Sequence, residues 1–131
     1  MISISDLQKI VKARIKDAEV LLASNRFDGA MYICGYAVEV ALKLRICKTL
    51  KWSDFPERAK DFESYKSFKT HNLDVLLHLS GVEGKVKTKY FAEWSTVTQW
   101  NPEARYNPIG SASQTDAENM INGAQRLIRF L

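Results

Sequence analysis

Cysteine, glycine and proline are scarce in this sequence of 131 residues, which contains two cysteines, six glycines and three prolines. Such low proportions of glycine and proline exclude collagen-like and low-complexity chains. With 46% hydrophobic residues, the chain is also too apolar to remain disordered. Its length lies within the usual range of one domain. We therefore expect a single globular domain that spans residues 1–131.

The two cysteines are too far apart to form a disulfide with each other. Cys34 and Cys47 fall within one predicted helix, thirteen positions apart, so about 20 Å of helical rise separates them. A disulfide requires Cα atoms within about 7 Å. We therefore expect two reduced, partly buried thiols.

Familiar metal and phosphate motifs are also missing. The only histidines are His71 and His78, and no His-x-x-x-His, Cys-x-x-Cys or Glu-x-x-His spacing occurs. No Gly-x-Gly or Gly-Lys-Ser/Thr run is present to cradle a phosphate chain. We expect no metal site and no cofactor of the common types.

The sequence has no apolar run near the 20 residues of a membrane span, and its first residues do not form a signal peptide. We expect a cytoplasmic protein without membrane contact. The formal net charge is +4. This excess fits either a solvated lysine-rich face or a phosphate-rich partner, and the charge alone does not separate the two.

Hydrophobic residues recur at helical spacing through most of the chain, and no segment alternates with period two. The expected helices cover residues 5–23, 27–50, 71–79, 85–97 and 115–131. Thr70 is the expected N-cap of the third helix, and Thr115 with Glu118 the capping box of the last. Residues 51–69 form a connector, and residues 98–113 form the longest loop. The expected fold is an all-α, up-and-down bundle of about five helices, with two long antiparallel helices at the N-terminus.

Arg14 lies in the middle of the apolar stripe of the first predicted helix. A guanidinium in that position needs a partner because an unpaired charge is costly to bury. We expect an ion pair or hydrogen bonds to a carboxylate or a helix end, with Glu39 as the favoured partner. Glu39 also stands four residues before Lys43 in the second helix, which is a favourable orientation for an ion pair.

The loop Trp100–Tyr106 places an arginine beside an aromatic residue in a segment stiffened by Pro102. Arg105 could bind a phosphate group while Tyr106 or Trp100 stacks on a base. Alternatively, Arg105 docks on the bundle and pairs with Glu39, and the aromatic rings cover the end of the core. His71 has two similar interpretations, as a residue that bonds the preceding loop or as a polar group facing a cleft.

Three segments together resemble one known family. They are the helix Ala-x-x-x-x-x-Tyr-Ala-x-Glu-x-x-Leu-Lys over Ala30–Lys43, the segment Thr70–Leu77 with its His-x-Leu, and the loop Trp100–Tyr106 with its Arg-Tyr. Their order and spacing resemble those of the HEPN domain, the higher eukaryotes and prokaryotes nucleotide-binding domain. The resemblance implies a helical bundle, a homodimer, and pairing with a minimal nucleotidyltransferase in a toxin–antitoxin system.

One part of the family pattern is missing. Ribonucleases of this family carry an arginine, four to six intervening residues and then a histidine. Here Arg58 is the last arginine before His71, thirteen positions upstream, and no histidine follows Arg105. We therefore expect a member of the non-catalytic branch.

The leading hypothesis is a module that binds a nucleotide or an RNA phosphate without turnover. The residues expected to bind are Arg105, Tyr106, Trp100, His71 and Lys43. Glu39 is expected to orient Arg105 or Lys43. Two alternatives remain: a metal-independent ribonuclease toxin with a rearranged site built on His71 and Arg105, and a pure protein-interaction domain.

Overall fold

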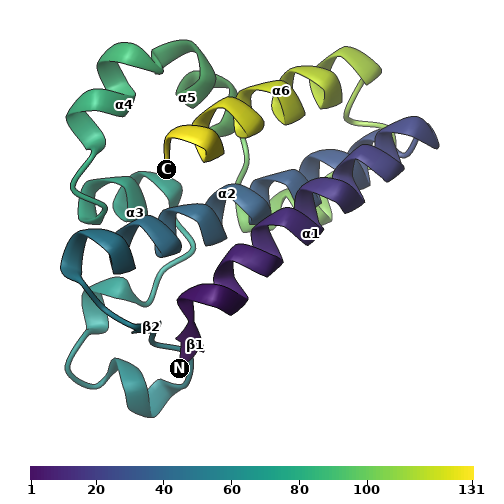
Figure 1. The fold of residues 1–131 in the computed structure, drawn as a ribbon. Helices are drawn as coiled ribbons and strands as arrows, with labels where there is room; N and C mark the ends of the chain where they lie inside the picture. The colour runs from purple at the N-terminus through teal and green to yellow at the C-terminus, as the bar shows by residue number, and fades with distance from the viewer.

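The fold is all-α, and its centre is the long second helix. The computed structural model describes all residues from Met1 to Leu131. Its helices are α1 (Ile4–Ala23), α2 (Phe27–Leu50), α3 (Leu73–Leu79), α4 (Glu83–Lys89), α5 (Phe91–Val97) and α6 (Gln114–Phe130). The two long N-terminal helices pack side by side, as expected, and α6 packs against both of them (Figure 1).

The central position of α2 follows from its composition. This helix is apolar on nearly every side, and 11 of its 24 residues are buried. Helices α1, α3 and α6 all contact it. α2 ends where Lys51 adopts the left-handed conformation, with φ 57° and ψ 38°. By contrast, α6 has one apolar face, because it lies on the outside of the bundle (Figure 1).

The expected helix over residues 85–97 is divided into α4 and α5. Tyr90 lies between them with φ −118° and ψ 30°, outside the helical region. Its ring stacks on Phe130 of α6, with centroids 5.0 Å apart. This contact with a distant helix explains why the local pattern did not predict the break.

The structure also corrects two expected helix caps. Asn72, not Thr70, is the N-cap of α3, because its side-chain oxygen accepts the N–H of Val75. The capping box of α6 consists of Ser113 and Asp116, two residues before the expected pair. In both cases the expected helix is present and only its limits differ.

The connector after α2 contains short ordered elements. Strand β1 (Ile2–Ser3) pairs antiparallel with β2 (Asp54–Phe55), with Ile2 opposite Phe55. Two 3₁₀ helices follow, η1 (Ala59–Phe62) and η2 (Lys66–Phe68). A third, η3 (Pro102–Tyr106), lies within the long loop between α5 and α6. Two-residue strands are too short to produce an alternating sequence pattern.

Both cysteines are buried and unpaired, as expected. The Sγ atom of Cys34 lies 3.7 Å from the carbonyl oxygen of Met120. Burial raises the pKa of the Cys34 thiol to about 12. The burial also raises the pKa of Cys47, so both residues act as small core side chains. None of the helices has the length and apolar character that crossing a bilayer would require.

Arg14 has a carboxylate partner, as expected, but the prediction that this partner is Glu39 is wrong. Its Nε atom lies 3.2 Å from Asp17, one turn further along α1. The Arg14 side chain is 44% exposed, so the apolar stripe of α1 does not enclose the guanidinium. Glu39 bonds to other residues instead, and the Arg14–Glu39 pair does not form.

Candidate functional site

Glu39 is the buried centre of a small polar cluster. Its residue is only 3% exposed, on the side of α2 that faces the start of α3. Lys43, one helical turn later, places Nζ 3.0 Å from Oε2 of Glu39. The Nδ1 atom of His71 lies 3.1 Å from both carboxylate oxygens. Both carboxylate oxygens are therefore engaged, which is what a buried carboxylate requires.

This arrangement fixes the orientation of the His71 ring. His71 lies just before α3, and its side chain is 64% exposed. When Nδ1 donates a hydrogen bond to Glu39, Nε2 is the ring nitrogen left to exchange a proton with solvent or a ligand. The ring is thus held on one side by a buried carboxylate and open on the other. This observation favours the interpretation of His71 as a polar group facing a cleft.

Trp100 is fixed by a glycine of α2. Its indole lies so close to Gly35 that a methyl group there would overlap ring atoms Cγ, Cδ1 and Cδ2. The ring also contacts Tyr36 edge-on, with centroids 5.3 Å apart. Trp100 is 5% exposed, and its Nε1 donor is buried without a hydrogen-bond partner. Trp100 is therefore part of the wall of the site, with little ring surface free to stack on a base.

Arg105 is exposed on η3, and its guanidinium stays near its own loop. Nη1 donates to the carbonyl of Pro102 at 3.2 Å. The guanidinium centre lies 4.8 Å from the ring centroid of Tyr106. Tyr106 and then Tyr32 raise the pKa of Arg105 above its ordinary value, so it remains charged. The alternative in which Arg105 pairs with Glu39 is wrong, because Lys43 and His71 occupy that carboxylate.

A cavity of about 580 Å³ lies between these segments. Its lining includes Tyr36 of α2, His71 from the segment before α3, and Trp100 and Arg105 from the loop before α6. Asp74 and Glu103 are also among its lining residues. The cavity therefore presents both signs of charge, and it is large enough for a small polar ligand.

Two of the predicted residues do not line this cavity. Lys43 lies behind it, with its side chain 17% exposed and its amine on Glu39. Tyr106 is 75% exposed, and its ring lies beside the guanidinium of Arg105. Lys43 therefore supports Glu39, and Tyr106 supports Arg105.

Sequence reasoning did not assign two tyrosines to the site. Tyr32 and Tyr36 precede Glu39 on the same stripe of α2, and their hydroxyls are 3.1 Å apart. The hydrogen bond with Tyr32, followed by burial, raises the pKa of Tyr36. The spacing of four residues between Tyr32 and Tyr36 was a usable signal.

A second cavity adjoins the first. Its volume is about 450 Å³, and Trp100 and Arg105 line both cavities. Its other polar lining residues are Asp28, Tyr32, Gln99, Asn107, Ser111 and Asp116. Asp28 accepts hydrogen bonds from the backbone N–H groups of Gly110 at 2.7 Å and Ala112 at 2.8 Å. These bonds hold the loop before α6 beside this second cavity.

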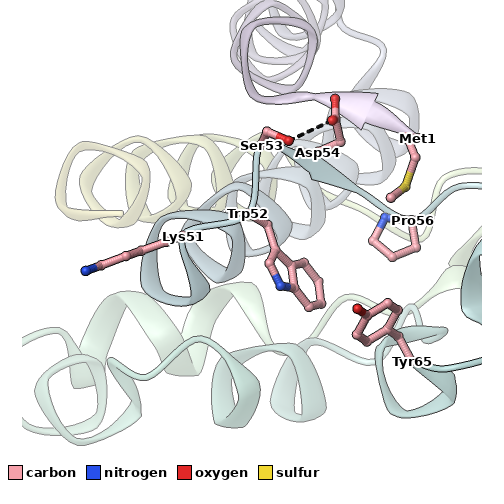
Figure 2. A pocket seen from close by; sticks show the side chains of 7 residues that line it. All are labelled: Met1, Lys51, Trp52, Ser53, Asp54, Pro56 and Tyr65. Carbon is pink, nitrogen blue, oxygen red and sulfur yellow. Dashed lines mark hydrogen bonds between the residues drawn. The ribbon is translucent and has the colours of Figure 1, made fainter.

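A third cavity lies at the strand connector and contains none of the predicted residues. Its volume is about 270 Å³. Figure 2 shows the ring of Trp52 facing Met1, Pro56 and the ring of Tyr65, which lie to its right in the view. The side chain of Lys51 extends away from them (Figure 2). The lining has no histidine or arginine, and its charged side chains are Lys51 and Asp54.

No group of three or more histidine, cysteine, aspartate or glutamate side chains is placed to hold a metal ion. Comparison of the chain with family models, curated proteins and solved structures finds no match. The arrangement around the 580 Å³ cavity must therefore be interpreted from its own chemistry.

Proposed function

We propose that the cavity lined by His71, Trp100 and Arg105 binds a phosphate-bearing nucleotide or an RNA phosphate, as in a HEPN-like binding module. One observation carries the proposal: His71, just before α3, lines the same cavity as Trp100 and Arg105 of the loop before α6, about 30 positions later in the chain. Arg105 supplies a permanent charge and a fork of N–H donors for a phosphate.

The mixed charge of the cavity narrows the ligand class. Asp74 and Glu103 line the same cavity as Arg105. Carboxylates accept hydrogen bonds from ribose hydroxyls and base amino groups, but they repel a highly charged triphosphate. The cavity therefore favours a nucleoside monophosphate or a single phosphodiester over a nucleoside triphosphate.

Titration calorimetry tests this proposal with AMP, ATP and a short single-stranded RNA, each at two salt concentrations. Arg105→Ala should weaken AMP binding at least tenfold, because one charged hydrogen-bond donor is lost. Arg58→Ala removes an exposed arginine of the connector and should leave the affinity unchanged.

Absence of binding to all three probes would contradict the proposal. It would favour the interaction-domain alternative, in which the loop Trp100–Tyr106 is only a structural contact. Equal losses of AMP affinity in Arg105→Ala and Arg58→Ala would show a general effect of net charge. That result would also contradict binding in this cavity.

The geometry favours one second candidate, a metal-independent ribonuclease. A carboxylate that holds one ring nitrogen of a histidine fixes the tautomer and leaves the other nitrogen for proton transfer. Glu39 and His71 have this relation. His71→Ala should abolish cleavage of a labelled RNA and keep the fold, because the side chain is largely exposed; unchanged cleavage would exclude His71 as the catalytic group.

The proposal extends to partners and location. The HEPN resemblance favours a homodimer that acts in the cytoplasm beside a minimal nucleotidyltransferase, as in toxin–antitoxin pairs. Two unpaired cysteines agree with a reducing compartment. Sedimentation of the purified protein tests the homodimer, and a neighbouring gene for a small nucleotidyltransferase would support the pairing.

A further inference from the structure

A second surface, away from the cavity, gathers positive charge around two aromatic rings. We name it the Phe130 surface, and it consists of Arg45, Lys85, Lys89, Tyr90 and Phe130. It lies where α4 meets the C-terminal end of α6 (Figure 1). The rings of Tyr90 and Phe130 stack at 5.0 Å with an interplanar angle of 27°.

Three cations surround these rings. The guanidinium centre of Arg45 lies 5.9 Å from the centroid of Phe130, and Nζ of Lys85 lies 5.3 Å from the same centroid. Nζ of Lys89 lies 5.8 Å from the centroid of Tyr90. The charges of Arg45 and Lys85 are thus separated by no more than about 11 Å, close to the screening length at physiological salt.

None of these three cations has a carboxylate partner. The carboxylates nearest in sequence to the two lysines are already paired, Glu83 with Lys87 at 3.9 Å and Glu93 with Arg126 at 3.5 Å. Glu39, the nearest in sequence to Arg45, bonds to Lys43 and His71. The Nε atom of Arg45 is also buried without a hydrogen-bond partner. Cation–π contacts hold the cations in place but do not cancel their charge. Their mutual repulsion would be relieved by an anionic ligand.

The pattern of rings and cations favours one class of ligand. Phe91, the residue after Tyr90, is an aromatic side chain that is 64% exposed. Lys89 and Lys85 precede this ring by two and six positions. Basic side chains together with an exposed aromatic ring suit single-stranded nucleic acid, in which phosphates alternate with bases that can stack. A purely acidic peptide would use the charges but would leave Phe91 without a matching group.

We propose that the Phe130 surface binds the backbone of single-stranded RNA, with Lys85 and Lys89 on phosphates and Phe91 stacked on a base. This inference goes beyond the cavity, because it makes the ligand a polymer that contacts a second site. Simultaneous binding of one RNA to both sites rests on the proposed function, in which the cavity binds an RNA phosphate. Binding of RNA to the Phe130 surface alone does not depend on the cavity.

The test measures the anisotropy of a fluorescein-labelled ten-residue oligouridylate over a series of salt concentrations. The double variant Lys85→Glu/Lys89→Glu should weaken binding more than tenfold at low salt. It should also reduce the slope of log affinity against log salt by about 1.4, the value for two single-strand phosphate contacts. Phe91→Ala should weaken binding about tenfold and leave the slope unchanged.

A matched double variant separates a local site from net charge. Lys60→Glu/Lys66→Glu makes the same charge change on the exposed connector and should leave the slope unaltered. Equal effects of the two double variants would overturn the proposal. Displacement of the RNA by polyglutamate of equal charge, with no effect of Phe91→Ala, would also overturn it and indicate an acidic protein instead.

Arg105→Ala distinguishes this proposal from that of the cavity. If the oligouridylate depends on Lys85 and Lys89 but not on Arg105, the Phe130 surface stands and the cavity fails as an RNA site. If binding depends on Arg105 alone, the cavity stands and the Phe130 surface is overturned.

Discussion

At the scale of single residues, one buried carboxylate organises the candidate site. Glu39 holds Lys43 and His71 at about hydrogen-bond distance while it is itself removed from solvent. The structure therefore assigns Glu39 a positioning role, as the sequence suggested, but its partners are Lys43 and His71 and not Arg105 or Arg14.

Glu39→Gln should destabilise the fold measurably. The amide keeps the size of the side chain but leaves Lys43, only 17% exposed, without its counter-charge. Loss of such charged hydrogen bonds should lower the free energy of unfolding by about 1.5–3 kcal/mol, as measured by urea denaturation. Asp17→Asn breaks the exposed pair with Arg14 and should change the free energy of unfolding by less than about 0.5 kcal/mol. Equal changes in this free energy for the two variants would contradict the role of Glu39 as the buried centre of the cluster.

Two glycines of α2 give a matched pair of opposite predictions. Gly35→Ala should lower the free energy of unfolding by about 1–3 kcal/mol, because the added methyl group overlaps the indole of Trp100. Gly29→Ala meets only Leu21, at 3.4 Å, and should raise it by up to about 1 kcal/mol through helix propensity. Thermal and urea unfolding of both variants measure whether each change in the free energy of unfolding has the expected sign. A Gly35→Ala variant more stable than the wild type would contradict the close contact between Trp100 and Gly35.

Some residue-level features could be predicted and others could not. The sequence indicated His71, Trp100 and Arg105 because of their chemical types and their loop positions. It could not indicate the pairing of Glu39 with His71, because the two are 32 positions apart and meet only when α3 packs on α2. Arg14 was misassigned because the helical wheel does not show how far α6 covers α1.

At the scale of elements, the loop before α6 is tied to the start of α2. Asp28 accepts the N–H groups of Gly110 and Ala112 with separate oxygens. These two bonds lower the pKa of Asp28 below its ordinary value of 3.8. The contact fixes this loop beside the 450 Å³ cavity, which Trp100 and Arg105 also line.

Asp28→Asn should therefore lower the melting temperature in a manner that depends on pH. A carboxyl whose pKa is lower in the folded state stabilises the fold above the unfolded pKa, and loses this effect as pH falls through the folded pKa. The difference between wild type and variant should be full at pH 7 and should shrink below about pH 4. A difference that stays constant from pH 7 to pH 2 would contradict this role of Asp28.

Helices were predictable here because their signals are local. The limits of α2 agree with the sequence, since the turn before it and the left-handed Lys51 after it mark both ends. The break at Tyr90 and the pairing of β1 with β2 were not predictable, because each depends on a contact with a distant segment. The periodic pattern of residues 85–97 is the same with or without that break.

At the scale of the whole molecule, the bundle brings two chemically different surfaces to the outside. The cavity combines Arg105 and His71 with the carboxylates of Asp74 and Glu103. The Phe130 surface has three cations without carboxylate partners. The net charge of +4 could not show this division, because it averages over both surfaces.

The central claim is that the cavity beside Trp100 binds a nucleotide phosphate, and one measurement tests it most directly. Proton–nitrogen NMR of the tryptophan indoles can follow all three side chains at once during titration with AMP. Trp100 lines the cavity, whereas Trp52 lines the separate cavity of the connector and Trp94 is buried in the core. The account predicts a saturable shift of the Trp100 signal that is lost in Arg105→Ala, with Trp52 unchanged. A Trp100 signal that does not move, or a shift confined to Trp52, would contradict it.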